Sequence, residues 1–295
     1  MKYVVTGSAG HISQPLTEKL LMAGHEVVVI GRHADKLQHL TDKGAVAAIG
    51  SLEDGSFLET TFAGADAVYL MIPPNFGAEN FRQYQNSVAR NFIDALKRNR
   101  IKYAVVLSSI GAHAGEGTGP VDGLADFEKM LSEISDINVK LLRPSYFMAN
   151  LLNMIPLIKN MQIMGANFGD SKIVLVHTND IAAAAAEELL ALNFIGQSVR
   201  YIAGDEKTGA EIASVIGNAI NKPDLQWVIF SDEEALQGLQ QAGLPPDFAR
   251  AYTTMGQALR EGSMQEDYWK NHPALSPTKL ADFALEFSAA FNSAT

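Results

Sequence analysis

The chain has 295 residues, carries a formal net charge of −10 and contains no cysteine. The acidic balance argues against nucleic acid as a general partner, because phosphate binding needs a basic face, and the lack of cysteine excludes disulfides and thiolate chemistry. Hydrophobic residues make up 47% of the sequence, which is typical of a globular protein with a sizeable core. No apolar run reaches the roughly 18 residues that a membrane span needs, so we expect a cytoplasmic protein with no membrane partner.

The first predicted element is a short apolar strand, Tyr3–Val5, which runs into a glycine-rich turn and then a helical pattern. Gly7 would allow the tight turn, and Gly10 would let the backbone approach a pyrophosphate that the N–H groups of the helix start then face. The alternative is an ordinary glycine-rich turn without a ligand, and Ser13 stands where helix packing usually favours Gly or Ala. On the ligand-binding interpretation, the cofactor residues of this loop are Thr6, Gly7, Ser8, Ala9, Gly10, His11 and Ile12.

The second predicted strand, Glu26–Ile30, is followed by Gly31 and Arg32. Enzymes that use NAD(H) usually place an Asp or Glu at this strand tip to bind the ribose 2′-hydroxyl. Here an arginine stands there instead, and a guanidinium can bind a 2′-phosphate through a fork of donors. The strand tip therefore favours NADP(H) over NAD(H), with a solvated surface charge as the alternative interpretation of Arg32.

Three further strands are predicted at Ala45–Ala48, Ala67–Met71 and Tyr103–Leu107. Ligands of doubly wound folds bind at the carboxyl ends of such strands. The two prolines after the second of these strands force the chain out of the sheet. The two serines after the third could bond a substrate oxygen or a carboxamide, or could cap the next turn. The residues predicted to contact the cofactor here are Ser51, Leu52, Met71, Ile72, Pro73, Pro74, Ser108 and Ser109.

The regular alternation of predicted strands and helices ends after a sixth predicted strand, Val139–Leu142. A Met-rich helix is expected over Asn150–Met164. A strand at Val174–His177, a helix at Asp180–Leu192 and a strand at Val199–Ala203 could return to the sheet. Beyond residue 210, helices dominate the pattern.

Strands and helices alternate along the first half of the chain. This alternation predicts an α/β protein with a Rossmann-type doubly wound parallel sheet and a smaller, mainly helical C-terminal part. We expect residues 1–150 to form the dinucleotide-binding domain, with residues 174–203 returning to the sheet. Residues 151–295 are expected to form a discontinuous part that covers the substrate. The clearest helix is predicted from an apolar stripe of Phe81, Tyr84, Val88, Phe92 and Leu96.

Taken together, these segments resemble the NmrA-like group of atypical short-chain dehydrogenases/reductases, and the resemblance runs nearly end to end. That group includes NADPH-dependent quinone oxidoreductases and catalytically silent NADP(H) sensors. The most specific match is Leu142–Leu151, with the pattern Leu-Arg-Pro-x-x-Phe-Met-x-Asn-Leu. The other matching segments are Thr6–Gly10, Arg32, Leu107–Ser109, Asp180–Ala182, Gly204, Glu211–Ala213, Gly243–Pro246 and Asp282–Ala284.

The chain departs from typical short-chain reductases at the residues that transfer a proton. Those enzymes use a Tyr with a Lys four residues on, and the corresponding positions here are Leu124 and Glu128. Lys129 is one residue off and would point about 100° away on a helix. Tyrosine-driven carbonyl reduction is therefore not expected, and an epimerase or dehydratase is disfavoured because it needs the same pair. Members of the NmrA-like group commonly lack this pair too.

A quinone makes smaller demands, because its reduced oxygen can take a proton from water while the protein supplies proximity and orientation. The sequence thus predicts an NADP(H)-dependent oxidoreductase that reduces a quinone or a similar small flat acceptor. The alternative is a non-catalytic NADP(H) sensor that binds a protein partner. Catalytic residues are not identified, no metal-ligand spacing is present among the histidines, and a homo-oligomer is left open. The candidates for the substrate wall are Tyr146, Phe147 and Asn150, with core packing as the alternative for Phe147.

Overall fold

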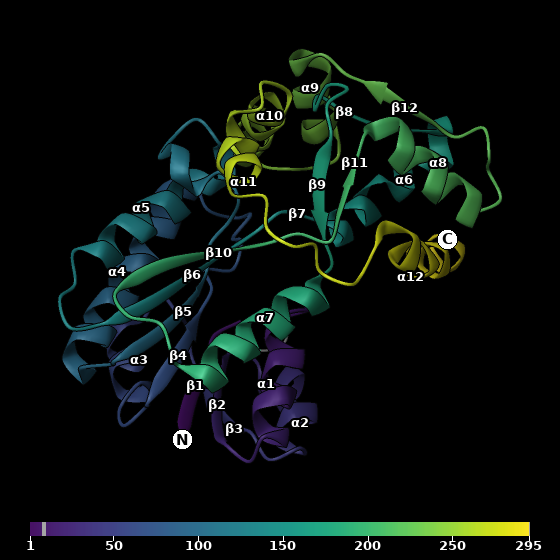
Figure 1. The fold of residues 1–295 in the computed structure, drawn as a ribbon. Coiled ribbons are helices and arrows are strands. Elements are labelled where there is room, and N and C mark those ends of the chain that lie inside the picture. Colours follow the sequence, from purple (N-terminus) through teal and green to yellow (C-terminus); the bar gives the residue numbers. More distant parts are fainter. Residues whose placement is uncertain (8–9, 295) are drawn as a thin grey trace. The chain divides into compact units, whose positions relative to one another are not determined.

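The computed structural model describes residues 1–7 and 10–294, and Figure 1 shows the course of the chain. Two compact units are present, and each is discontinuous in sequence. Unit 1 contains residues 1–109, 123–143 and 181–200, and unit 2 contains residues 110–122, 144–180 and 201–295. The functional division of the chain at residue 150 stays a prediction.

A seven-stranded sheet, in the order β10-β6-β5-β4-β1-β2-β3, forms the centre of unit 1. Strands β1 to β6 pair in parallel, with Val4 beside Val28 and Val68 in the register of β1. The order reverses between β1 and β4, which makes this a Rossmann-type doubly wound sheet with its topological switch point at that place. The strands are β1 (Lys2–Val5), β2 (Glu26–Gly31), β3 (Val46–Ile49), β4 (Ala67–Leu70), β5 (Tyr103–Leu107), β6 (Asn138–Pro144) and β10 (Gln197–Ile202).

Helices cover both faces of this sheet, as its uninterrupted apolar strands require. In Figure 1, α3, α4 and α5 lie on one face, and α1, α2 and most of α7 lie on the other. The helices are α1 (Ser13–Met22), α2 (Ala34–Thr41), α3 (Gly55–Thr61), α4 (Phe81–Asn99), α5 (Asp122–Ser132) and α7 (Thr178–Ala191).

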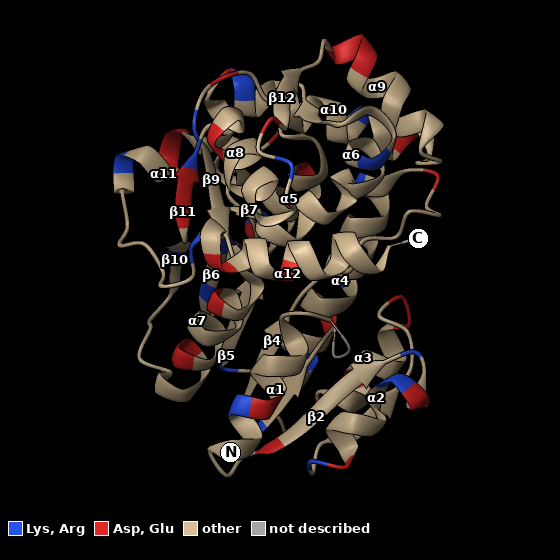
Figure 2. Cartoon of the chain, turned by 90° about the vertical axis from the view of Figure 1, so that its right-hand side faces the viewer, with Lys and Arg blue, Asp and Glu red and all other residues tan. Residues whose placement is uncertain are grey.

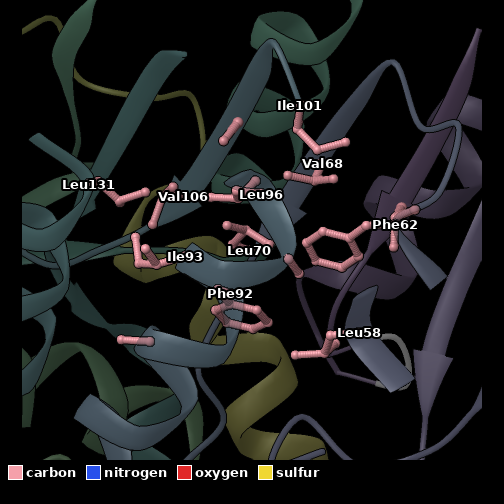
Figure 3. Packing of buried hydrophobic residues seen from close by; sticks show 14 of the residues in the cluster. Leu58, Phe62, Val68, Leu70, Phe92, Ile93, Leu96, Ile101, Val106 and Leu131 are labelled. Carbon is pink, nitrogen blue, oxygen red and sulfur yellow. The ribbon is translucent and has the colours of Figure 1, made fainter. Parts of the chain in front are cut away.

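The core of unit 1 lies between the sheet and α4 (Figure 3). The Phe92 ring lies 6.4 Å from the Phe62 ring and 5.9 Å from the Phe127 ring, measured between centroids. The predicted stripe on α4 is confirmed, since four of its five members are buried and Tyr84 packs partly buried against the same core. The Asn80 side chain caps this helix by accepting a hydrogen bond from the Gln83 N–H at 2.8 Å.

Unit 2 contains two small sheets and most of the later helices. One sheet has the order β11-β9-β7 and the other pairs β12 with β8 in parallel. Its strands are β7 (Tyr146–Phe147), β8 (Ile163–Ala166), β9 (Ile173–Val176), β11 (Asp205–Lys207) and β12 (Gln226–Ile229). Its α-helices are α6 (Ile155–Met161), α8 (Gly209–Ala219), α9 (Asp232–Gln241), α10 (Pro246–Arg260), α11 (Glu266–Asn271) and α12 (Leu280–Ser293), and its 3-10 helices are η1 (Ala112–Ala114), η2 (Gly119–Val121), η3 (Met148–Met154) and η4 (Ser263–Gln265).

Two expectations for this part are wrong. Residues 150–164 do not form one helix, because the chain passes through η3 and α6 and then enters β8 at Ile163. Only part of 174–203 returns to the large sheet: β10 joins it, whereas β9 pairs with β7 and β11. The short apolar runs were compatible with either structure, and pairing with distant strands decided between them.

The acidic run at residues 232–234 forms the first turn of α9. Figure 2 shows these acidic residues at the start of α9. Ser231 caps α9 by accepting from the Glu234 N–H at 3.2 Å, while Glu234 accepts from the Ser231 N–H at 2.8 Å. Carboxylates at this end also suit the positive end of the helix dipole. Among the described residues, no helix is long and apolar enough to cross a bilayer.

Candidate functional site

The turn after β1 is fixed to the end of β4 by Thr6. Its hydroxyl oxygen accepts a hydrogen bond from the Met71 N–H at 2.7 Å and lies 3.2 Å from the Tyr69 carbonyl oxygen, to which it donates. The Thr6 N–H donates to the same carbonyl at 3.1 Å. Strands β1 and β4 flank the switch point, so these bonds hold the glycine turn at the place where doubly wound folds bind ligands.

The backbone of this turn strongly favours glycine at position 7 and leaves little room for a side chain at position 10. Gly7 has a φ of +70°, and a Cβ at this position would lie 2.5 Å from the Met71 Sδ. The Gly10 N–H donates to the Gly7 carbonyl at 2.9 Å, and a Cβ on Gly10 would lie 3.0 Å from that oxygen. Ser8 and Ala9, which the sequence also assigns to the cofactor, lie outside the described residues.

The start of α1 has the features of an anion site. Among the residues that the structure describes, no side chain caps this helix and its first turn has no acidic residue. Ser13, at its first position, is 1% exposed, and its hydroxyl has no hydrogen-bond partner within the described chain. An uncapped helix start offers N–H donors and a positive dipole end to a phosphate. His11 is exposed and Ile12 is buried at this turn.

Arg32 follows β2 directly and is exposed. It makes no ion pair with any described residue, so its guanidinium is available to an anionic ligand. The positive charge of Arg32 also acts on the Tyr84 hydroxyl of α4. Burial and the Glu53 carboxylate raise the pKa of the Tyr84 hydroxyl, and the positive charge of Arg32 opposes them.

The chain after β3 and β4 presents apolar side chains that are only partly covered. Leu52, Ile72 and Tyr84 are half-buried and pack against the core of unit 1. The Asn91 amide donates to the Leu52 carbonyl at 3.0 Å, and the Glu53 N–H donates to the Ser51 hydroxyl at 3.2 Å. Met71 and Pro73 are half-buried, and Pro74 is exposed. These residues could hold the flat adenine and the middle of a dinucleotide.

A buried polar cluster lies at the ends of β5 and β6, and the sequence reasoning missed it. The Ser108 hydroxyl donates to the Glu128 carboxylate. Arg143 holds both oxygens of that carboxylate, from Nε at 3.0 Å and from Nη2 at 2.6 Å. The signal that could have revealed it is an arginine inside an apolar strand, which needs a buried partner.

This cluster includes Glu128, which the sequence spacing aligns with the lysine of the proton-transfer pair of typical short-chain reductases. Glu128 is buried with Arg143, Leu124 is half-buried and Lys129 is exposed. The Ser108 hydroxyl is directed to Glu128, and Ser109 takes part in contacts within the protein. A ligand-binding role for either serine stays a prediction.

The predicted substrate residues lie in unit 2. Tyr146 is 8% exposed, whereas Phe147 and Asn150 are half-buried. Met148, between them in sequence, is fully buried. The Tyr146 hydroxyl lies 3.1 Å from the hydroxyl of Tyr252 on α10, a partner that no local sequence pattern indicates. Within the described residues, no group of three acidic or histidine side chains could hold a metal ion.

All the predicted cofactor positions that the structure describes therefore follow the carboxyl ends of five adjacent parallel strands, β3 to β5 in the sheet order. Residues 7–148 match the family model described as NAD(P)H-binding. The unpartnered Ser13 hydroxyl and the exposed Arg32 fit a dinucleotide on observations of this chain alone.

Known proteins resemble this chain over nearly its full length. An NAD(P)H azoreductase of Xenophilus azovorans is 25% identical over 296 residues and covers 99% of both chains. An NADPH-dependent quinone oxidoreductase of Escherichia coli, solved in complex with NADPH, has a TM-score of 0.76 at 23% identity and covers 96% of this chain and 99% of its own. A nucleoside-diphosphate-sugar epimerase of Staphylococcus aureus has a TM-score of 0.81 at 17% identity, with 97% and 100% coverage.

The solved structures share the fold across different chemistries, so the fold alone does not identify a reaction. The family model covers most of the glycine turn, the Arg32 position and the strand ends that carry the other residues predicted from the sequence to bind the cofactor. Residues 7–148 of this chain therefore resemble an NAD(P)H-binding domain.

Proposed function

We propose that this protein is an NADPH-dependent oxidoreductase that transfers hydride to a quinone or a similar small flat acceptor. The observation that carries the proposal is the cofactor end of unit 1, where an uncapped helix start with an orphan hydroxyl adjoins the glycine turn. Two of the similar proteins are named as an azoreductase and a quinone oxidoreductase, which supports a conjugated acceptor. When bound, NADPH supplies the hydride.

The preference for NADPH over NADH rests on Arg32. The side chain is exposed at the tip of β2, and no described residue neutralises it. A guanidinium forms strong, charge-assisted hydrogen bonds to a phosphate, and the ribose hydroxyl of NADH offers it no such partner. Arg32 would therefore bind the 2′-phosphate.

The choice of acceptor follows from the missing proton-transfer pair. Leu124 and Glu128 cannot act as the Tyr and Lys of typical short-chain reductases, and Glu128 is bound to Arg143. A quinone needs one hydride and one proton to become a hydroquinone, and water can supply the proton once the hydride has moved. The chain's own task is then to bind and orient the two reactants.

The experiment is a titration of the purified protein with NADPH and with NADH, followed by the addition of small quinones. We expect Arg32→Asp to weaken NADPH binding by about 10-fold to 100-fold, the range for charge-assisted hydrogen bonds, and to leave NADH binding nearly unchanged. Arg90→Asp is the matched control, because Arg90 is also exposed and has no ion pair with a described residue. Equal loss for both nucleotides would refute the assignment of Arg32.

The same titration tests a second candidate, a regulatory NADP(H) sensor without turnover. The loss of the Tyr/Lys pair is the observation that favours it. Protein-dependent oxidation of NADPH by any quinone supports the oxidoreductase, whereas tight binding with no oxidation across a broad quinone panel supports the sensor.

A further inference from the structure

Two tyrosine hydroxyls meet inside unit 2. Tyr146 belongs to β7 and Tyr252 to α10, and their hydroxyl oxygens are 3.1 Å apart. The Tyr146 side chain is 8% exposed, and Tyr252 is half-buried. The pair joins residues that are 106 positions apart in sequence.

The two hydroxyls carry two protons but use only one between them. One hydroxyl donates to the other, and the accepting hydroxyl keeps its own proton. No second acceptor for either hydroxyl exists among the described residues. Burial raises the pKa of both hydroxyls, so both protons are retained at neutral pH. Buried donors are normally paired, so the spare proton suits an acceptor atom on a ligand.

Aromatic rings flank the pair. The Phe168 ring meets the Tyr146 ring edge-on, with 5.5 Å between centroids and an interplanar angle of 72°. The Phe248 ring lies 5.8 Å from the ring of Tyr252. Such surroundings favour a ligand with a flat ring over a sugar-like ligand.

We propose that the Tyr146–Tyr252 pair donates a hydrogen bond to a carbonyl oxygen of a flat aromatic acceptor, which makes Tyr252 a specificity-determining residue. The inference rests on the proposed function for the class of acceptor. The inference adds Tyr252 to the substrate-contacting residues expected from the sequence. It also assigns a hydrogen-bonding function to these residues. The pair positions the acceptor and transfers no proton in this proposal.

The test compares two flat ligands with the same two-ring skeleton and sulfonate group, of which only one has carbonyl oxygens. The probes are 1,4-naphthoquinone-2-sulfonate and naphthalene-2-sulfonate, titrated calorimetrically into the full-length protein. The variants are Tyr252→Phe and Tyr146→Phe, each of which removes a hydroxyl and keeps the ring. Tyr103→Phe is the control, because Tyr103 belongs to unit 1 and its hydroxyl bonds to no described residue.

We expect Tyr252→Phe to weaken quinone binding by about threefold to tenfold, the range of one neutral hydrogen bond, and to leave naphthalene-2-sulfonate binding unchanged. Tyr146→Phe should act in the same direction, and Tyr103→Phe should have no effect. Equal loss for both probes, no loss for the quinone, or no saturable quinone binding by the wild type overturns the inference.

Titration of each variant with NADPH separates this outcome from a failure of the proposed function. An unchanged NADPH affinity in Tyr252→Phe, together with a selective loss for the quinone, assigns the effect to the acceptor. A parallel loss of NADPH affinity shows general damage to the protein and overturns the specific role of Tyr252.

Discussion

Each unit contains an arginine that holds a carboxylate through two hydrogen bonds, and the two pairs differ mainly in burial. In unit 1 the Arg143 and Glu128 side chains are 10% and 8% exposed. In unit 2 the Arg260 and Asp232 side chains are 34% and 33% exposed, at distances of 2.8 and 3.0 Å. The same chemical contact therefore has two consequences: the buried pair is costly to break from one side, and the exposed pair is weakened by water and salt.

The largest effect is expected when one member of the buried pair is removed. Arg143→Leu leaves the Glu128 carboxylate buried without its cation, and the free energy of unfolding should fall by about 3–5 kcal/mol. Chemical denaturation followed by circular dichroism measures the change. The double variant Arg143→Leu/Glu128→Leu should recover a substantial part of the loss, because it leaves no unpaired charge. A double variant that is less stable than the single one would contradict this explanation.

A smaller effect is expected for the exposed pair. Arg260→Leu should lower the free energy of unfolding by about 1 kcal/mol, since water already screens much of the attraction. The loss should shrink further in about 1 M salt, where the Debye length is about 3 Å. The loss caused by Arg143→Leu should be nearly independent of salt. If both losses respond to salt alike, burial is not what distinguishes the pairs.

The smallest effect is the acid dependence of the exposed pair. Hydrogen bonds from Arg260 and Asn167 lower the pKa of Asp232 from 3.8 to about 2. A carboxyl whose pKa is lowered by folding stabilises the protein above its unfolded pKa, and the contribution is lost as the pH falls through the folded value. Asp232→Asn should therefore lose less stability than the wild type between about pH 4 and pH 2.

Denaturation curves at several pH values in this range measure that difference. Glu233→Gln is the control, because Glu233 is the next residue along the chain and is exposed. An identical pH slope in Asp232→Asn and the wild type would show that Asp232 contributes nothing to acid sensitivity.

The sequence predicted the parts of the fold that depend on neighbouring residues. The strands of the large sheet are short apolar runs between turn residues, and β1, β4 and β5 lie within one residue of their expected ends. The glycine turn could also be predicted, because Gly7 adopts a backbone conformation with a positive φ that favours glycine. The stripe on α4 has a period that only a helix explains.

The features that the sequence did not predict correctly depend on contacts between segments that are far apart in the chain. Residues 163–166 form a strand only because they pair with residues 226–229. Glu128 is buried because it is paired with Arg143 on β6. Tyr252 contacts Tyr146 because α10 packs beside β7 at this point. Local patterns do not identify such partners. An arginine inside an apolar strand indicates that a buried partner exists but not which residue it is, and no local pattern indicates the second tyrosine.

The aromatic rings around the Tyr146–Tyr252 pair also bear on the tryptophan fluorescence of the protein. The chain has two tryptophans. The ring of Trp227 lies 6.3 Å from Phe168, which itself contacts Tyr146, whereas Trp269 packs on Tyr268 with 4.9 Å between centroids. A Trp269→Phe protein would emit only from the Trp227 indole, which a single ring, that of Phe168, separates from Tyr146. Its emission colour and lifetime would then follow events at that pair without any attached dye.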